Sequence, residues 1–393
     1  MQPQARPRPA PPSAGSGAGV LLAVGAVVTV GVLPVFLVGG LAVQIRTELG
    51  LSVSLLGLAG SMFFATSALA ARVLAAVTER VGPPAALRLA AAGSGACLAA
   101  LAVVPSTAWL IVVLCLAGIP AALSQPAANE LLMVRVPIHR RGFAFAVKQS
   151  AIPASTLLAG LAVPTVGLSV GWRWAFLIAG GLGLLAVPAV PRSPRWRPIR
   201  SAGPPRRSAG LLLLALAAVT GLGAAAANAM GTFTTVSAVH VGFDPATAGL
   251  MLGLGSAVGL GMRLVAGVVA DRAQPDLLRM VAAMLGLGAV GYLLLAVGHP
   301  VAFVFGLVLG FGAGWAWPGV FNYAVAARFP DRVASATSVT QTGVYIGAAG
   351  GPLLFGVVAE QSPAVAWLIC AMLAALATGA LLVVLAVQRR SRR

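Results

Sequence analysis

Arg263-Leu264-Val265-Ala266-Gly267-Val268-Val269-Ala270-Asp271-Arg272 is an apolar segment with an arginine at its start and an Asp-Arg pair two helical turns later. A related stretch, Arg72-Val73-Leu74-Ala75-Ala76-Val77-Thr78-Glu79-Arg80-Val81-Gly82, lies in the first half of the chain. Each stretch places one arginine inside an apolar run and charged residues at the end of that run. The pair therefore predicts an internally duplicated chain in which two buried arginines face each other.

The composition excludes a soluble globular protein. The chain has 393 residues, of which 59% are hydrophobic and 9% charged, and its mean hydropathy is +0.97. Such a chain lacks the polar surface that a soluble protein needs, so it is predicted to be an all-α integral membrane protein. The formal charge of +18 does not favour nucleic acid as a partner, because the positive residues lie between hydrophobic segments rather than on one polar face.

Twelve segments are long and apolar enough to cross a bilayer, which takes about 20 residues in a helix. Their predicted ranges are roughly 19–44, 52–78, 84–104, 107–133, 142–168, 171–190, 209–240, 245–270, 276–297, 299–328, 333–359 and 363–387. The arginines of the loops and tails fall almost entirely on one side, and the other side has only Arg46 and Arg173. This bias predicts a multi-pass protein of the cytoplasmic membrane with both termini in the cytoplasm.

The two halves of the chain can be superimposed in sequence. Arg80 and Arg272 are 192 positions apart (272 − 80), and the same offset relates Gln149 to Gln341. The predicted organisation is a disordered cytoplasmic tail at 1–18, an N-terminal six-helix bundle at 19–190, a basic cytoplasmic linker at 191–208, a C-terminal six-helix bundle at 209–388 and a basic tail at 389–393. Six crossings return the chain to the side where it began, so the repeats are parallel.

These features resemble the major facilitator superfamily over the whole chain. That family has a G-x-x-x-D-R-x-G-R-R type motif after its second span, and here Glu79, Arg80 and Gly82 occupy the acidic, basic and glycine positions. The first copy departs from the pattern at Pro83 and Pro84, where basic residues are usual. The second copy keeps the glycine and the aspartate. The resemblance implies twelve transmembrane helices in two bundles that rock about a central solute site.

The resemblance also implies that the loop motifs form a latch on the inner side. The candidate gating residues are Glu79, Arg80, Asp271 and Arg272. They lie at helix ends, where ion pairs and contacts with helix termini hold one state and break in the other. The alternative interpretation is that they are ordinary solvated loop charges.

The arginines inside the spans carry the prediction of substrate. Arg72 and Arg263 have no acid one turn away on their own helices, and guanidinium matches the oxygens of carboxylate, nitrate or phosphate. An eighth-span arginine at this place resembles the monocarboxylate, oxalate and nitrate/nitrite carriers, and the cyanate-permease branch is similar in general texture. The alternative is a structural arginine that binds backbone carbonyls or extends towards the inner surface.

Other polar residues in the spans are candidates for the lining of the site. The predicted substrate contacts, besides the two arginines, are Asn129, Asn322, Gln149, Gln341 and Trp315. The amides could instead tie helices together. Glu130 and Lys148 are candidates for coupling. Lys148 either adds positive potential or pairs with Glu130 near the inner mouth, and we expect the pairing. Proton symport is a hypothesis, because the position one turn before Arg263 is Gly259 rather than an acid.

The sequence predicts a transporter and not an enzyme. It contains no catalytic constellation, phosphate-binding loop or metal-spaced cluster, and Cys97, Cys115 and Cys370 fall inside apolar runs. We therefore expect a monomeric secondary active permease that moves a small organic or inorganic anion by alternating access, without cofactor, metal or nucleic acid. The alternative is a drug or metabolite efflux antiporter of the same superfamily.

Overall fold

The structure is a computed structural model and describes residues 14–136, 141–190, 210–273, 275–329 and 333–390. All its regular elements in these ranges are helical. They are α1 (Ala14–Gly40), α2 (Ala42–Leu49), α3 (Val53–Val81), α4 (Pro83–Ala102), α5 (Thr107–Arg135), α6 (Arg141–Gln149), α7 (Ala151–Ala162), η2 (Val163–Gly171), α8 (Trp172–Ala189), α9 (Gly210–His240), α10 (Pro245–Ala273), α11 (Leu277–Ala296), α12 (Pro300–Leu309), η4 (Gly310–Gly314), α13 (Pro318–Arg328), α14 (Val333–Ala359) and α15 (Pro363–Arg390).

The predicted fold of twelve transmembrane helices is confirmed. Eleven helical stretches in the described ranges are long and apolar enough to cross a membrane, and one of them, Val147–Ala189, has 43 residues. At about 1.5 Å per residue that stretch is roughly twice as long as a bilayer core is thick. The chain reverses within it at Gly171, whose φ of 103° is a left-handed conformation that glycine adopts without strain. The stretch is therefore two crossings.

Two of the twelve spans are broken where the sequence alone predicted continuous helices. The fifth consists of α6, α7 and η2, and the tenth consists of α12, η4 and α13. Proline lies at the first position of α13 (Pro318) and in the first turn of α7 (Pro153), where its missing N–H interrupts the hydrogen-bond ladder. The first span begins at Ala14, and the predicted linker at 191–208 lies outside the described residues.

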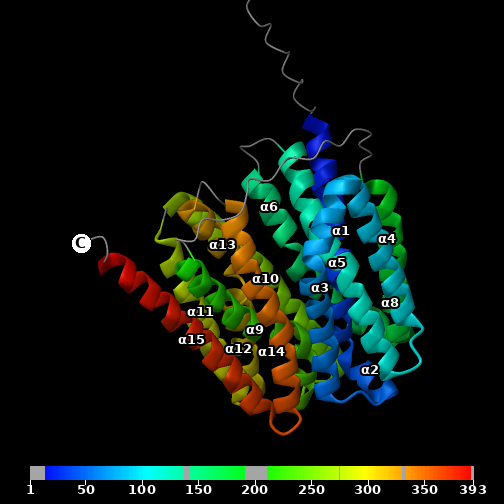
Figure 1. The fold of residues 1–393 in the computed structure, drawn as a ribbon. Coiled ribbons are helices and arrows are strands. Elements are labelled where there is room, and N and C mark those ends of the chain that lie inside the picture. Colours follow the sequence, from blue (N-terminus) through cyan, green and yellow to red (C-terminus); the bar gives the residue numbers. More distant parts are fainter. Residues whose placement is uncertain (1–13, 137–140, 191–209, 274, 330–332, 391–393) are drawn as a thin grey trace, which may run out of the picture.

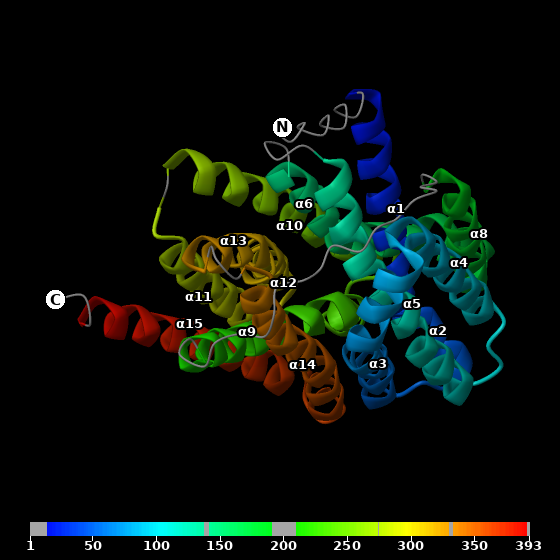
Figure 2. The ribbon, with the colours of Figure 1, turned by 45° about the horizontal axis from the view of Figure 1, so that its top comes forward.

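The first and second halves of the chain lie side by side (Figures 1 and 2). Within the first half α4 packs against α5 and α8, and within the second half α11 packs against α15 and α14 against α9. Contact between the halves comes mainly from α3 with α14 and from α7 with α10. We call the end of the bundle where α1 starts and α15 finishes the termini end, and the opposite end the far end.

The buried apolar side chains of the two halves form one shared core towards the far end and separate cores at the termini end. One large cluster contains residues of both halves, among them Phe36, Phe63, Phe233 and Phe355. At the termini end there are two separate clusters, one made of first-half residues such as Val24 and the other of second-half residues. The structure is therefore closed at the far end, and the cores of the two halves are separate at the termini end.

Candidate functional site

Arg263 links the two halves of the molecule. It lies on α10, where its Nη1 donates a hydrogen bond of 2.7 Å to the carbonyl of Gln149 and its Nη2 donates one of 2.9 Å to the carbonyl of Trp315. Gln149 ends α6 in the first half, and Trp315 follows η4 in the second half. One half-buried guanidinium thus bridges the fifth and tenth spans, as the alternative interpretation of the sequence anticipated.

Both acceptors are carbonyls that the broken helices leave unpaired. In a continuous helix the carbonyl of Gln149 would accept from the residue four positions later, but that residue is Pro153, which has no N–H. The carbonyl of Trp315 lies in the turn between η4 and α13, which Pro318 terminates. Buried carbonyls need donors, and Arg263 supplies one to each break. Pro153, four residues after a predicted site residue, was the sequence signal for this contact.

Aromatic rings at the break in the tenth span also make contacts between the halves. The ring of Trp315 lies 5.8 Å from that of Phe36 on α1, edge to face, and 5.3 Å from that of Phe311. Trp315 is buried, and its contact with a solute stays a prediction. Phe36 was not singled out in the sequence, because a phenylalanine in an apolar span carries no signal of its own.

Lys148 is buried but has a different partner from the one predicted. Its Nζ donates a hydrogen bond of 2.8 Å to Asn129 Oδ1, and only 6% of the residue is exposed. The expected ion pair with Glu130 is wrong for this state, since the ion pairs between described residues are Arg173–Glu48 and Arg279–Asp276. Glu130 Oε2 is buried without a hydrogen-bond partner. Asn129 and Glu130 are neighbours in sequence, but a helix turns about 100° between them.

Three more of the predicted solute contacts are half-buried: Asn322, Gln341 and the side chain of Gln149. The side chain of Arg72 lies outside the described residues, so its place relative to Arg263 stays a prediction.

The predicted latch residues are not engaged in the part of the chain that the structure describes. Glu79, Arg80 and Arg272 are exposed at the termini end, and neither ion pair described there or elsewhere involves them. The side chain of Asp271 lies outside the described residues. Their role as a latch stays a prediction.

Polar and backbone contacts between the halves lie at the far end and the middle. Thr235 Oγ1 donates to the carbonyl of Gly39 at 2.6 Å, and Ser256 Oγ donates to Thr156 Oγ1 at 2.7 Å. Where α3 meets α14, a Cβ added at Gly57 would lie 2.3 Å from the carbonyl oxygen of Pro352. Only glycine permits so close an approach of two backbones.

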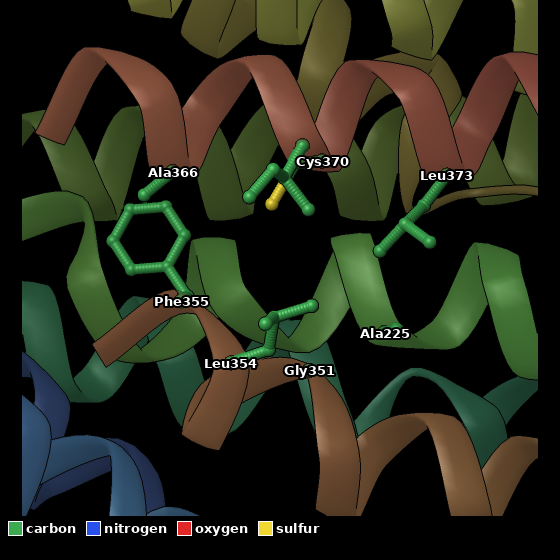
Figure 3. Close-up of a pocket in the computed structure, with 8 residues that line it drawn as sticks. Ala225, Gly351, Leu354, Phe355, Ala366, Cys370 and Leu373 are labelled. Atoms are coloured by element: carbon green, nitrogen blue, oxygen red, sulfur yellow. The ribbon is translucent and has the colours of Figure 1, made fainter. Parts of the chain in front are cut away.

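A small pocket inside the second half is not a solute site. It lies between α9, α14 and α15, and Figure 3 shows Phe355, Leu354 and Cys370 directed into it. Its lining is apolar apart from the thiol, and its volume of about 10 Å³ is near the minimum for one water molecule. Cys370 is buried, as expected of a core residue. The described residues contain no group of three or more His, Cys, Asp or Glu side chains that could hold a metal.

Comparisons with known proteins agree on one family. The family model for the Major Facilitator Superfamily matches residues 17–325, and no curated protein sequence matches the chain significantly. Among solved structures, a bacterial homologue of the human lysosomal transporter Spinster is similar in its inward-facing, occupied form, with a TM-score of 0.73 and 18% identity over 95% of this chain and 96% of that one.

Two further structures have the same fold. The unoccupied inward-facing form of the Spinster homologue has a TM-score of 0.72 and 16% identity, over 95% of this chain and 96% of that one. A D-xylose-proton symporter has a TM-score of 0.68 and 17% identity, over 92% of this chain and 96% of that one. At such identities the likeness concerns the fold alone.

Proposed function

The chain belongs to the major facilitator superfamily, a family of membrane transporters for small solutes, and from that premise we propose that its solute is an anion bound by Arg263. The observation that carries this proposal is the geometry of the Arg263 guanidinium. It is fixed by carbonyls from both halves, and neither of the ion pairs among described residues neutralises it. A cation held inside a span without a carboxylate favours a ligand of negative charge.

The guanidinium also has donors to spare. Of its five N–H groups, two are used on the carbonyls of Gln149 and Trp315, so three are available to a solute oxygen. The carbonyls hold the planar group in one orientation, which lowers the entropy lost when an anion binds. Arg263 and Trp315 belong to the second half and Gln149 to the first, so movement of the halves must change the bond between Arg263 and Gln149. Solute binding at Arg263 and rocking of the halves are thereby coupled.

Lys148 is proposed to contribute a positive charge from the first half. Its ammonium group is buried and has one described hydrogen bond, to Asn129, and Asn129 is one of the predicted lining residues. A buried ammonium without a carboxylate is costly, and an anion would offset this cost.

The other proposed solute contacts are Arg72, Asn322, Gln149 and Gln341. Glu130 is the proposed site of proton coupling, because its buried oxygen has no hydrogen-bond partner among the described residues.

We propose that the termini end faces the cytoplasm and that the structure is inward-facing. The charge bias of the loops supports this orientation, and the joined far-end core supports the state. Alternating access then requires the far-end contacts of α3 with α14 and of α7 with α10 to open. At the same time the latch residues Glu79, Arg80, Asp271 and Arg272 would engage at the termini end.

The proposal is tested by transport in proteoliposomes. Wild-type protein and Lys148→Gln are given a panel of labelled small anions, including formate, lactate, oxalate and nitrate, and separately a cationic dye. We expect at least one anion to be transported, with an affinity that is roughly 10- to 150-fold lower in Lys148→Gln, since a charge-assisted hydrogen bond contributes about 1.5–3 kcal/mol. A pH step in the same assay reports proton coupling. Transport of the dye without any anion would support the efflux antiporter instead.

Restoring the helix at the first break is predicted to weaken anion binding. Pro153→Ala supplies an N–H four residues after Gln149, which competes with Arg263 for the Gln149 carbonyl. We expect the apparent affinity for the transported anion to fall by roughly 3- to 10-fold, the equivalent of one hydrogen bond of about 1 kcal/mol. The matched control is Pro188→Ala inside α8, which is expected to leave the affinity unchanged. Equal effects of the two variants would contradict the role given to the break.

A further inference from the structure

A carboxylate at the far end joins the two halves. Glu360 directly follows α14, and its Oε1 accepts hydrogen bonds from the backbone N–H of Ser54 at 2.8 Å and from Ser54 Oγ at 3.0 Å. Ser54 is the second residue of α3, so an acid of the second half binds the N-terminus of a first-half helix. Free N–H groups and the helix dipole make that end favourable for negative charge.

The contact is placed where α3 and α14 come closest. Beside the Glu360–Ser54 contact, a Cβ added at Gly356 would lie 2.8 Å from the carbonyl oxygen of Val53. One helical turn further from the far end, Gly57 on α3 packs against the backbone of Pro352 on α14. If α3 and α14 separate at this end, Glu360 must lose the Ser54 N–H. The hydrogen bonds therefore exist in the far-closed state and not in the far-open state.

A cavity beside the contact brings solvent to the carboxylate. It has a volume of about 620 Å³ and is lined by the ends of α2, α9 and α14, including Glu360, Arg46 and His240. Arg46 Nε donates to the carbonyl of Leu51, and His240 is exposed. These two are the other titratable or charged residues in the lining.

We propose that Glu360 is the gate of the far end: its ionised carboxylate, bound to the N-terminus of α3, stabilises the far-closed state, and its protonation releases that state. The inference rests on the alternating-access part of the proposed function and is independent of the charge of the solute. It adds a second control of access at the end opposite the predicted latch.

The direction of the pH effect follows from the bonds. The backbone N–H of Ser54 is the largest influence that lowers the pKa of Glu360 below its ordinary value of 4.5, with the hydroxyls of Ser54 and Ser52 acting in the same sense and burial opposing them. In the far-open state these bonds are absent and the pKa returns towards the ordinary value. The stabilisation of the far-closed state is therefore complete above about pH 4.5 and is lost as the pH falls through the lowered pKa.

The test measures the distance between the halves at the far end. Spin labels are placed at Val103 and Val297, exposed residues that follow α4 and α11, after the native cysteines have been replaced. Pulsed distance measurements in liposomes then compare the parent with Glu360→Gln. We expect the ratio of far-open to far-closed molecules to rise by roughly 3- to 10-fold in the variant, as for the loss of a charge at a helix N-terminus and its hydrogen bonds.

Glu48 provides the matched control. Glu48 also lies at the far end, and it accepts hydrogen bonds from Trp172 Nε1 and Arg173 Nη2. Both of these partners belong to its own half. Glu48→Gln should leave the distance distribution unchanged. In the parent protein, lowering the pH from 7 to 4 should shift the distribution towards the far-open form, and this shift should be smaller in Glu360→Gln. The proposal is overturned if Glu360→Gln has the same distances as the parent at pH 7, or if lowering the pH shifts Glu360→Gln as much as it shifts the parent. Either result would count whether or not the solute is an anion.

Discussion

Arg263→Ala is expected to reduce transport of the anionic solute by roughly two orders of magnitude or more. The substitution removes a guanidinium with three available donors, and charge-assisted hydrogen bonds contribute about 1.5–3 kcal/mol each. It also leaves the carbonyls of Gln149 and Trp315 without the donors that they have now. The loss should appear in the initial rate of uptake into proteoliposomes at equal amounts of folded protein, with thermal unfolding used to compare stability.

Arg263→Lys separates charge from geometry. Lysine keeps the positive charge, but its compact ammonium lacks the planar fork of donors that lets arginine bind two carbonyls and an anion at once. We expect it to recover folding and a minor part of the transport rate.

Arg173→Ala is the matched control for these variants. Arg173 also donates to two backbone carbonyls, of Ala102 and Val104, but it is paired with Glu48 at the far end. Its removal should lower stability while anion affinity stays within about twofold. Wild-type transport by Arg263→Ala would contradict the anion site.

The sequence predicted the framework of this site better than its contacts. Span length, loop charge and the register between the halves depend on local composition and on chain order, so they were accessible without coordinates. The partners of Arg263 were not, because they lie 114 and 52 residues away in sequence and belong to helix breaks. Pro153 indicated one break, yet a proline in a span does not say which side chain will satisfy the freed carbonyl.

The partner of Lys148 was missed for a related reason. Asn129 and Glu130 differ by one position on α5, and a charge rule selects the acid, whereas the helical turn presents the amide. The contact of Glu360 with Ser54 spans 306 residues and depends on the conformational state as well as on the fold. Contacts between halves that move are the part of this molecule that sequence patterns describe least.

Gly57→Ala is expected to open the far end. The added Cβ would lie 2.3 Å from the backbone oxygen of Pro352, and this oxygen cannot move without α14. Overpacking of this kind costs about 1–3 kcal/mol, and here the cost applies only to the far-closed state, because the far-open state separates α3 from α14. The ratio of far-open to far-closed molecules should therefore rise by roughly 5- to 150-fold. Steady-state transport should fall because the carrier does not return to the far-closed state.

Gly60→Ala is the control that distinguishes this effect from a general response to alanine in α3. Gly60 lies one turn further along the helix, and its nearest neighbour would be 3.7 Å from an added Cβ, which is ordinary contact. Alanine also favours helix at both positions by a similar amount. Spin-label distances between Val103 and Val297 should thus change in Gly57→Ala and not in Gly60→Ala. Parent-like distances in Gly57→Ala would mean that the close approach of α3 and α14 does not hold the far end closed.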